Sequence, residues 1–180
     1  MNWKILIAIA GCMPLNLQAE GVGRKFDRFK NLTTFSAKSR LDFPSDPKYR
    51  SIFYKIEMLA MFSCPGDVAS CSPSAVTVHF AFGDHVKMLY PQSTIEMLIN
   101  DKPVSVGRVV IDGTILGADD YFEIAEISLP TTTFLGIVQA ETVEIQIAGM
   151  EFRLTTENFV SLGSLREHIA TTKKRPQNSN

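Results

Sequence analysis

The closing segment of the chain, residues 143–169, constrains the fold more than any other stretch. Two runs of alternating apolar and polar residues, 143–147 and 150–154, flank a two-residue connection that contains Gly149. Such alternation on both sides of a glycine-containing connection predicts a β-hairpin with one buried face. The apolar positions of that face are Val143, Ile145, Ile147, Met150, Phe152 and Leu154.

A helix is predicted directly after this hairpin. Thr155 or Thr156 can cap its first turn through a side-chain hydroxyl, and Glu157 suits the positive end of the helix dipole. Its apolar residues recur at helical spacing, at Phe159, Leu162, Leu165 and Ile169. We therefore expect this apolar stripe to pack against the apolar face of the hairpin.

The rest of the chain has the pattern of short strands separated by turns. Strands are expected at 33–38, 52–62, 75–82, 95–99, 104–106 and 121–129, and a short helix after Pro130. Asp112-Gly113, within 109–116, predicts a further chain reversal. Roughly seven or eight strands favour a mainly β fold, an antiparallel β-sandwich or partly open barrel with a short helix and a C-terminal helix packed on it. The alternative is a two-layer α+β fold in which the terminal helix packs across a single sheet.

The N-terminus has the pattern of an export signal. Residues 1–4 form a short charged region, residues 5–13 are apolar, and Ala19 is a small residue suited to cleavage. The apolar run is too short for a transmembrane helix, which needs about 20 residues. We expect a signal peptide (1–19), a single β-rich domain (26–170) and a disordered tail (171–180).

A second interpretation of the N-terminus competes with cleavage after Ala19. Residues 9–12, Ile-Ala-Gly-Cys, resemble a bacterial lipobox, in which Cys12 would be acylated and become the first residue of a lipoprotein. The segment before Cys12 is unusually short for this, which favours ordinary cleavage and a periplasmic or secreted product over a membrane-anchored lipoprotein. A third alternative is that the segment is a buried N-terminal strand.

The charge balance argues against nucleic-acid binding. The net charge is −1, and removal of the signal peptide with Lys4 leaves 17 Lys and Arg against 19 Asp and Glu, or −2. Nucleic-acid binding needs a concentrated basic face. Basic residues do gather in two short clusters, one interleaved with aromatic residues: Arg24, Lys25, Phe26, Arg28, Phe29 and Lys30, and Lys173, Lys174 and Arg175. These clusters could touch an anionic envelope surface, although most short basic clusters are solvated chain ends.

Cys64, Cys71, His79 and His85 are the one group that combines several types of metal ligand. Zinc sites usually draw each cysteine pair from a gap of about two to four residues, whereas six residues separate Cys64 from Cys71. Export leaves these two as an even pair, because Cys12 is either removed with the signal peptide or consumed by lipidation. An oxidising compartment would close the pair, so we expect a Cys64–Cys71 disulfide rather than a metal site.

No arrangement of residues predicts catalysis or a cofactor. His79 lies on the polar face of its strand, while His85 and His168 each follow an acidic residue and are explained by local structure. Asp119-Asp120 could act as acid and base or bind a cation, but a pair of acids in a loop is usually solvated. The sequence contains neither a G-x-S-x-G nor a G-x-x-x-x-G-K-[ST] motif.

Several segments resemble an uncharacterised group of secreted bacterial β-rich proteins. These segments are 26–30 with Thr33-Thr34, 99–102, 129–135, 143–147 and 151–154. The resemblance covers most of the chain after residue 19 and implies a bacterial source and a β fold. It implies no functional residues, because the group has no assigned activity. The Cys64/Cys71 pair and the absence of a glycine-rich stretch near Asp112-Gly113 depart from the pattern of the group.

Three functions are compatible with these features. The first is a non-catalytic exported module that binds another envelope component or a protein through a sheet edge or a loop. The second is a carrier for a small apolar ligand, suggested by residues 58–62, which are apolar on both faces of their strand. The third is a hydrolase whose site has no recognisable motif.

Overall fold

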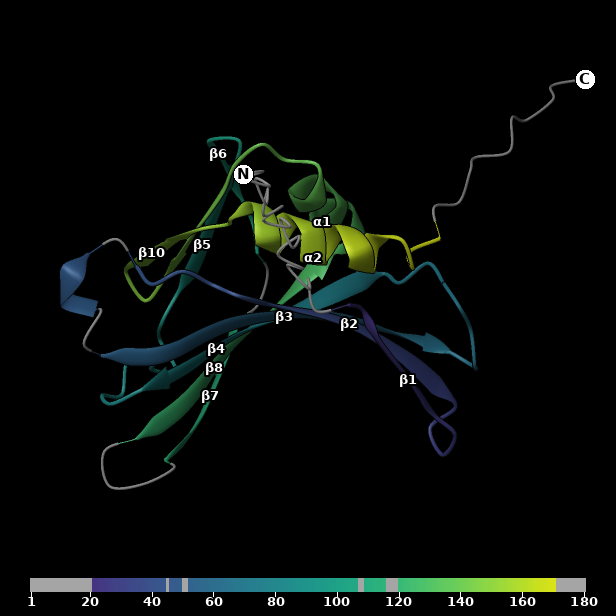
Figure 1. Cartoon of the computed structure of the whole chain (residues 1–180), viewed down its shortest axis with the longest axis horizontal. Helices are drawn as coiled ribbons and strands as arrows, with labels where there is room; N and C mark the ends of the chain where they lie inside the picture. The colour runs from purple at the N-terminus through teal and green to yellow at the C-terminus, as the bar shows by residue number, and fades with distance from the viewer. Residues whose placement is uncertain (1–20, 45, 50–51, 107–108, 116–119, 171–180) are drawn as a thin grey trace, which may run out of the picture.

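The computed structural model describes residues 21–44, 46–49, 52–106, 109–115 and 120–170. Within these residues the chain forms ten β-strands in two antiparallel sheets, two α-helices and one short 3-10 helix, η1 (Pro47–Tyr49) (Figure 1). The predicted signal peptide, the lipobox cysteine Cys12, the basic cluster 173–175 and the predicted tail all lie outside the described residues.

The larger sheet has six strands in the order β1-β2-β3-β4-β8-β7. They are β1 (Gly23–Asp27), β2 (Leu32–Arg40), β3 (Phe53–Pro65), β4 (Ala75–Asp84), β8 (Tyr121–Pro130) and β7 (Val109–Ile115). Buried and half-buried residues alternate along β2 and through most of β4, as expected for strands with one face on the core. Figure 1 shows the second sheet and both helices on the same side of this large sheet.

The smaller sheet has four strands in the order β10-β9-β5-β6. They are β10 (Met150–Arg153), β9 (Val143–Ile147), β5 (Ile95–Ile99) and β6 (Lys102–Val104). The predicted β9–β10 hairpin is confirmed, with Ala148 and Gly149 at φ angles of 49° and 79°. Two adjacent residues with positive φ match the tight turn that suits the right-handed twist of a hairpin.

The chain reversal predicted at Asp112-Gly113 is wrong. Both residues lie within the continuous strand β7, where Asp112 pairs with Ile124 and Gly113 with Glu123 of β8. Pairing with the long strand β8 satisfies the backbone groups of β7, and this long-range gain outweighs the local turn preference of Asp-Gly. The Asp112 side chain instead accepts a hydrogen bond from the Gly113 N–H.

The predicted terminal helix is confirmed as α2 (Thr156–Arg166), and the predicted short helix as α1 (Thr131–Val138). Thr155 caps α2, because its side chain accepts a hydrogen bond from the Asn158 N–H. In return, the Asn158 side-chain oxygen accepts a hydrogen bond from the Thr155 N–H, at 2.8 Å. This reciprocal arrangement is a capping box, and it defines where the helix begins.

The expectation that α2 packs against the closing hairpin holds only in part, because Leu162 lies beside Ile145 and Leu154 of that hairpin. The helix lies chiefly along β2 of the larger sheet. The buried Asn158 side chain donates to the Arg40 carbonyl at 2.8 Å, and Ser161 Oγ donates to the Lys38 carbonyl at 3.1 Å. Strand β1 pairs with β2 only as far as Ser36, so beyond that point polar side chains of α2 satisfy backbone groups of β2.

The core lies between the two sheets, with the helices closing one side. Leu162 of α2 is 2% exposed and lies among residues of both sheets, including Val78 and Ile145. The rings of Phe82 and Phe152 join the two sheets directly, with centroids 6.0 Å apart. The predicted fold class is therefore confirmed as a mainly β fold of two antiparallel sheets with two helices packed on it.

Candidate functional site

The predicted disulfide between Cys64 and Cys71 is confirmed, with the two Cα atoms 6.0 Å apart. Cys64 is buried near the end of β3, and residues 64–71 form a short ring that we call the disulfide loop. His79 lies in the middle of β4 and pairs with Glu126 at 3.0 Å. In the part of the chain that the structure describes, no group of three or more His, Cys, Asp or Glu is placed to hold a metal ion.

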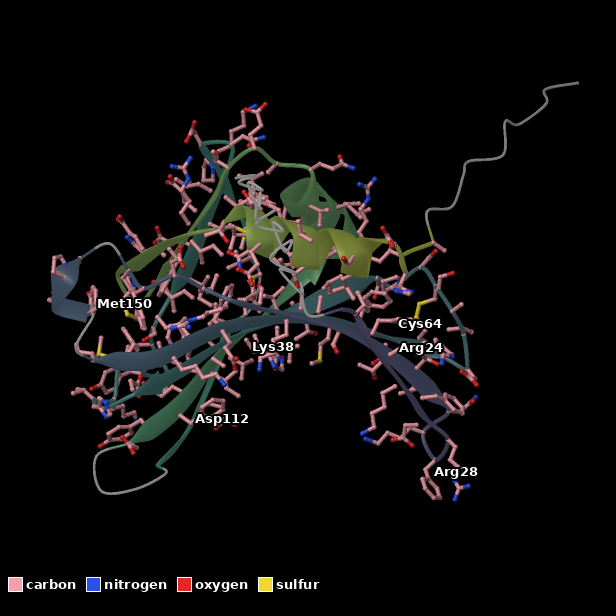
Figure 2. All side chains as sticks on the ribbon, viewed as in Figure 1. Arg24, Arg28, Lys38, Cys64, Asp112 and Met150 are labelled. Carbon is pink, nitrogen blue, oxygen red and sulfur yellow. A yellow bond between two sulfur atoms is a disulfide. The ribbon has the colours of Figure 1, made fainter. Side chains whose placement is uncertain are left out.

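The disulfide loop lies along a hairpin that we call the basic arm, residues 23–36, where β1 pairs with β2. The Arg24 guanidinium pairs with the Asp67 carboxylate and donates from Nε to the Val68 carbonyl at 3.1 Å. Thr33 Oγ1 donates to the Gly66 carbonyl at 2.6 Å. Contacts therefore run from the loop to both strands of the arm, and Figure 2 shows Arg24 beside Cys64.

The same loop also binds the segment that follows α2. The Cys71 N–H donates to the His168 carbonyl at 3.1 Å, and the Ala170 N–H donates to the Cys71 carbonyl at 2.7 Å. The His168 ring donates from Nδ1 to the Ala69 carbonyl at 3.0 Å and stacks on Phe35. The disulfide loop is thus a hub that joins the arm, the end of β3 and the segment after the last helix.

The tip of the basic arm is the turn formed by residues 28–31. The Asp27 carboxylate shapes it by accepting hydrogen bonds from the Phe29 and Lys30 N–H groups, at 2.9 and 3.2 Å. Asn31 closes the turn with a φ angle of 50°, a conformation that asparagine tolerates better than most residues. Figure 2 shows Arg28 at the far end of the arm, away from the rest of the molecule.

An exposed aromatic side chain lies beside a cation at this tip. Phe29 is 87% exposed, and the Arg28 guanidinium lies 4.9 Å from the centre of its ring. Lys25, Arg28 and Lys30 oppose the single carboxylate of Asp27, because the charge of Arg24 is matched by Asp67 at the base. The exposed end of the arm is therefore both apolar and positively charged.

A buried pair of acids, Asp84 and Glu123, was not predicted from the sequence. They lie on the core faces of β4 and β8 and are 0% and 2% exposed. Glu123 accepts hydrogen bonds from the backbone N–H groups of Met88 and Leu89, at 2.7 and 3.0 Å. The carboxyl oxygens of Asp84 have no hydrogen-bond partner among the described residues. Burial, together with the neighbouring Glu123, raises the pKa of Asp84 to about 8.

This acid pair has the composition of a general acid and base but not the access. A buried carboxyl with a raised pKa beside a second carboxyl is typical of acid–base catalysis. A cavity of about 170 Å³ beside them is lined by Glu123, Asp112, Lys87 and Tyr121, among others, but not by Asp84. Both carboxylate oxygens of Glu123 already accept backbone hydrogen bonds. We therefore assign no catalytic residue here.

The remaining polar residues singled out from the sequence form local pairs. His85 Nδ1 lies 2.8 Å from the Asp120 carboxylate, and both side chains are about half exposed. Asp119, the other member of the predicted acidic pair, lies outside the described residues.

A groove of about 360 Å³ on the outer face of the small sheet is lined by Glu96, Glu144, Glu151 and Arg153, among others. These side chains form the solvent-exposed face expected of a sheet that is covered on one side only.

The fold and this site define a mainly β, disulfide-containing domain with a projecting basic hairpin. No family model and no curated protein sequence matches the chain. The disulfide is compatible with an exported location in an oxidising compartment. Among the described residues, neither helix combines the length and apolar character needed to cross a bilayer.

Proposed function

We propose that the chain is an exported, non-catalytic module that binds another component of the cell envelope, and that the basic arm is its contact surface. The observation that carries this proposal is the tip of the arm, where the Arg28 guanidinium lies against the exposed Phe29 ring and exposed Lys25 and Lys30 are close in the chain. An exposed aromatic ring beside arginine is typical of binding surfaces, because it offers a large contact area with few rotatable bonds.

The support that the arm receives favours a binding role. Strand β2 pairs with β3 over its whole length, and the disulfide loop holds β1 through Arg24 and β2 through Thr33. The arm is therefore ordered before a partner arrives. A surface that is already ordered loses less conformational entropy on binding. The cysteine pair also links this arm to an oxidising compartment, which supports the exported location.

The interior of the domain does not favour the carrier alternative. Met58, Ala60 and Phe62 point into the core, while Leu59 and Met61 are half-buried on the other face of the large sheet. The space left among the core residues of both sheets around Leu162 is about 10 Å³. Sites for small ligands usually measure about 300 Å³ or more. Core packing therefore accounts for the apolar residues that suggested a carrier, and we propose none.

The test is binding of the full chain to an envelope fraction. The protein is expressed with its own N-terminal segment in its native host, purified without reductant and sedimented with envelope from the same host. The arm variant is Arg28→Ala, Phe29→Ser and Lys30→Ala combined. The control combines Lys102→Ala, Val160→Ser and Arg166→Ala, which removes the same charge and one exposed apolar side chain elsewhere.

We expect the parent and the control to sediment with the envelope and the arm variant to stay in solution. Because the changed side chains are exposed, all three proteins should unfold at about the same urea concentration. Equal sedimentation of the arm variant and the control would refute the proposal. A parent protein that does not bind envelope at all would also refute it.

A further inference from the structure

The partner of the basic arm can be identified from the chemistry of its tip. Three consecutive residues, Arg28, Phe29 and Lys30, place one apolar ring between two cations at the end of a projecting turn. At a membrane surface, aromatic rings lie at the level of the lipid headgroups, and the stems of Lys and Arg lie along apolar groups while their charges meet the phosphates. The tip has this combination of groups.

The charge of the arm also suits a membrane surface. Asp27 is the one acid among residues 23–36, and its carboxylate is engaged with backbone N–H groups inside the turn. Lys25, Arg28 and Lys30 are all exposed, so their charges face solvent together. Each cation near an anionic bilayer strengthens binding by about fivefold. The three together should therefore strengthen binding to an anionic surface by about 100-fold.

The small size of the tip favours a bilayer over a protein as partner. A stable protein interface usually buries about 800 Å² on each side. A four-residue turn cannot supply that area by itself, whereas a bilayer accepts a single ring and a few cations and requires no matching shape. Figure 2 shows Arg28 at the end of the arm, away from the rest of the molecule, so the tip is open to a flat surface.

We infer that the basic arm docks on an anionic lipid bilayer, with the Phe29 ring entering the headgroup region and Lys25, Arg28 and Lys30 meeting lipid phosphates. This inference rests on the proposed function and names the partner of the same arm. Raising the ionic strength should weaken the binding, because salt screens charges at an exposed surface.

The test uses vesicles made of equal parts phosphatidylcholine and phosphatidylglycerol, with pure phosphatidylcholine vesicles as the uncharged comparison. The full chain, with its disulfide intact, should bind the mixed vesicles and not the pure ones. Arg28→Gln with Lys30→Gln should weaken binding by about 25-fold, which is fivefold for each cation. Phe29→Ser should weaken it by about tenfold. The matched control, Lys102→Gln with Arg166→Gln, should bind as the parent does.

Fluorescence gives an independent readout of where the ring goes. The chain has one tryptophan, Trp3, within the predicted signal peptide, so the parent protein is a suitable blank for a Phe29→Trp variant. Its emission should move to shorter wavelength on the mixed vesicles and stay unchanged on pure phosphatidylcholine. An unchanged emission on the mixed vesicles would contradict insertion of residue 29.

The outcomes separate this inference from the proposed function. If the chain binds envelope through the arm but does not bind the mixed vesicles, the partner is an acidic protein surface or another envelope polymer. The lipid inference is then wrong and the proposed function stands. If the arm variants bind the mixed vesicles as tightly as the control does, the lipid inference is also wrong.

Discussion

Replacement of Asp84 by asparagine should stabilise this protein at neutral pH. The Asp84 carboxyl is fully buried, has no hydrogen-bond partner among the described residues and lies beside Glu123. Burial, and then the neighbouring Glu123 carboxyl, raise the pKa of Asp84 to about 8 from its ordinary value of 3.8. Between these two values the folded protein holds a proton that the unfolded chain has released. The free energy of unfolding therefore falls as the pH rises through this range.

The size of the effect follows from the width of that range. About four pH units separate the two pKa values, and each is worth about 1.4 kcal/mol, so the full loss is on the order of 6 kcal/mol. About three of those pH units lie below pH 7, so the loss of unfolding free energy at pH 7 is about 4 kcal/mol. Asparagine has nearly the same shape and cannot ionise, and its amide can donate to Glu123. Asp84→Asn should therefore avoid most of this loss.

Urea denaturation of the parent and of Asp84→Asn between pH 4 and pH 9 measures the effect. We expect similar stabilities near pH 4, then a gap that widens by about 1.4 kcal/mol per pH unit and levels off above about pH 8. Asp112→Asn, at an exposed position on β7, is the matched control and should stay within about 0.5 kcal/mol of the parent. Parallel stability curves for the parent and Asp84→Asn would refute the reasoning.

Three further predictions concern the core, the cysteines and the N-terminus. Leu162→Ala should lower the free energy of unfolding by about 2–4 kcal/mol in urea, because it leaves a cavity between both sheets, whereas exposed Glu157→Ala should stay within about 0.5 kcal/mol. Equal effects would contradict the burial of Leu162. Thiol counting on the unfolded, unreduced protein should find no free Cys64 or Cys71, and replacing both by serine should cost about 2–3 kcal/mol. Intact mass of protein from its native host should show loss of the predicted signal peptide. A mass starting at an acylated Cys12 would instead support the lipoprotein alternative, and retention of the whole segment would contradict both.

The elements that could be predicted from the sequence are those whose signals are local. The β9–β10 hairpin has alternating residues on both sides of Ala148-Gly149, and both turn residues adopt the positive φ that such a connection requires. Thr155 caps α2 through contacts within three residues along the chain. Strand β1 was missed because nearly all of its residues are exposed, so it shows no alternating apolar pattern.

The docking of α2 could not be predicted from its apolar stripe alone. That stripe shows which side of the helix is buried, and Leu162 and Leu165 are buried as it predicts. Two polar residues, Asn158 and Ser161, join the helix to the backbone of β2. Their role depends on where β1 ends along β2, which is a property of the assembled sheet and not of the helix sequence.

The acid pair shows the same difference between local pattern and long-range structure. Asp84 continues the buried alternation of Phe80 and Phe82, and Glu123 begins the buried alternation that Ala125 continues. An acid at the end of a strand is usually solvated. Both residues are buried here because β4 pairs with β8 and because the backbone at 88–89 bonds to Glu123. The position of each acid within the buried alternation was the only signal available in the sequence. The pairing of β4 with β8 is needed to show that both carboxyls are buried.

The disulfide was predictable because export leaves two cysteines in an oxidising compartment. Its structural role was not predictable. The loop it closes bonds to the arm, since the Gly66 N–H donates to the Asn31 carbonyl at 2.8 Å and the Val68 N–H donates to Thr33 Oγ1 at 3.2 Å. We expect reduction to loosen these two hydrogen bonds while the core between the sheets keeps its contacts. Reduction should therefore speed hydrogen exchange at the Gly66 and Val68 amides and leave the amides of central β4 protected. Equal exchange at those two amides in oxidised and reduced protein would show that the arm holds its position without the disulfide.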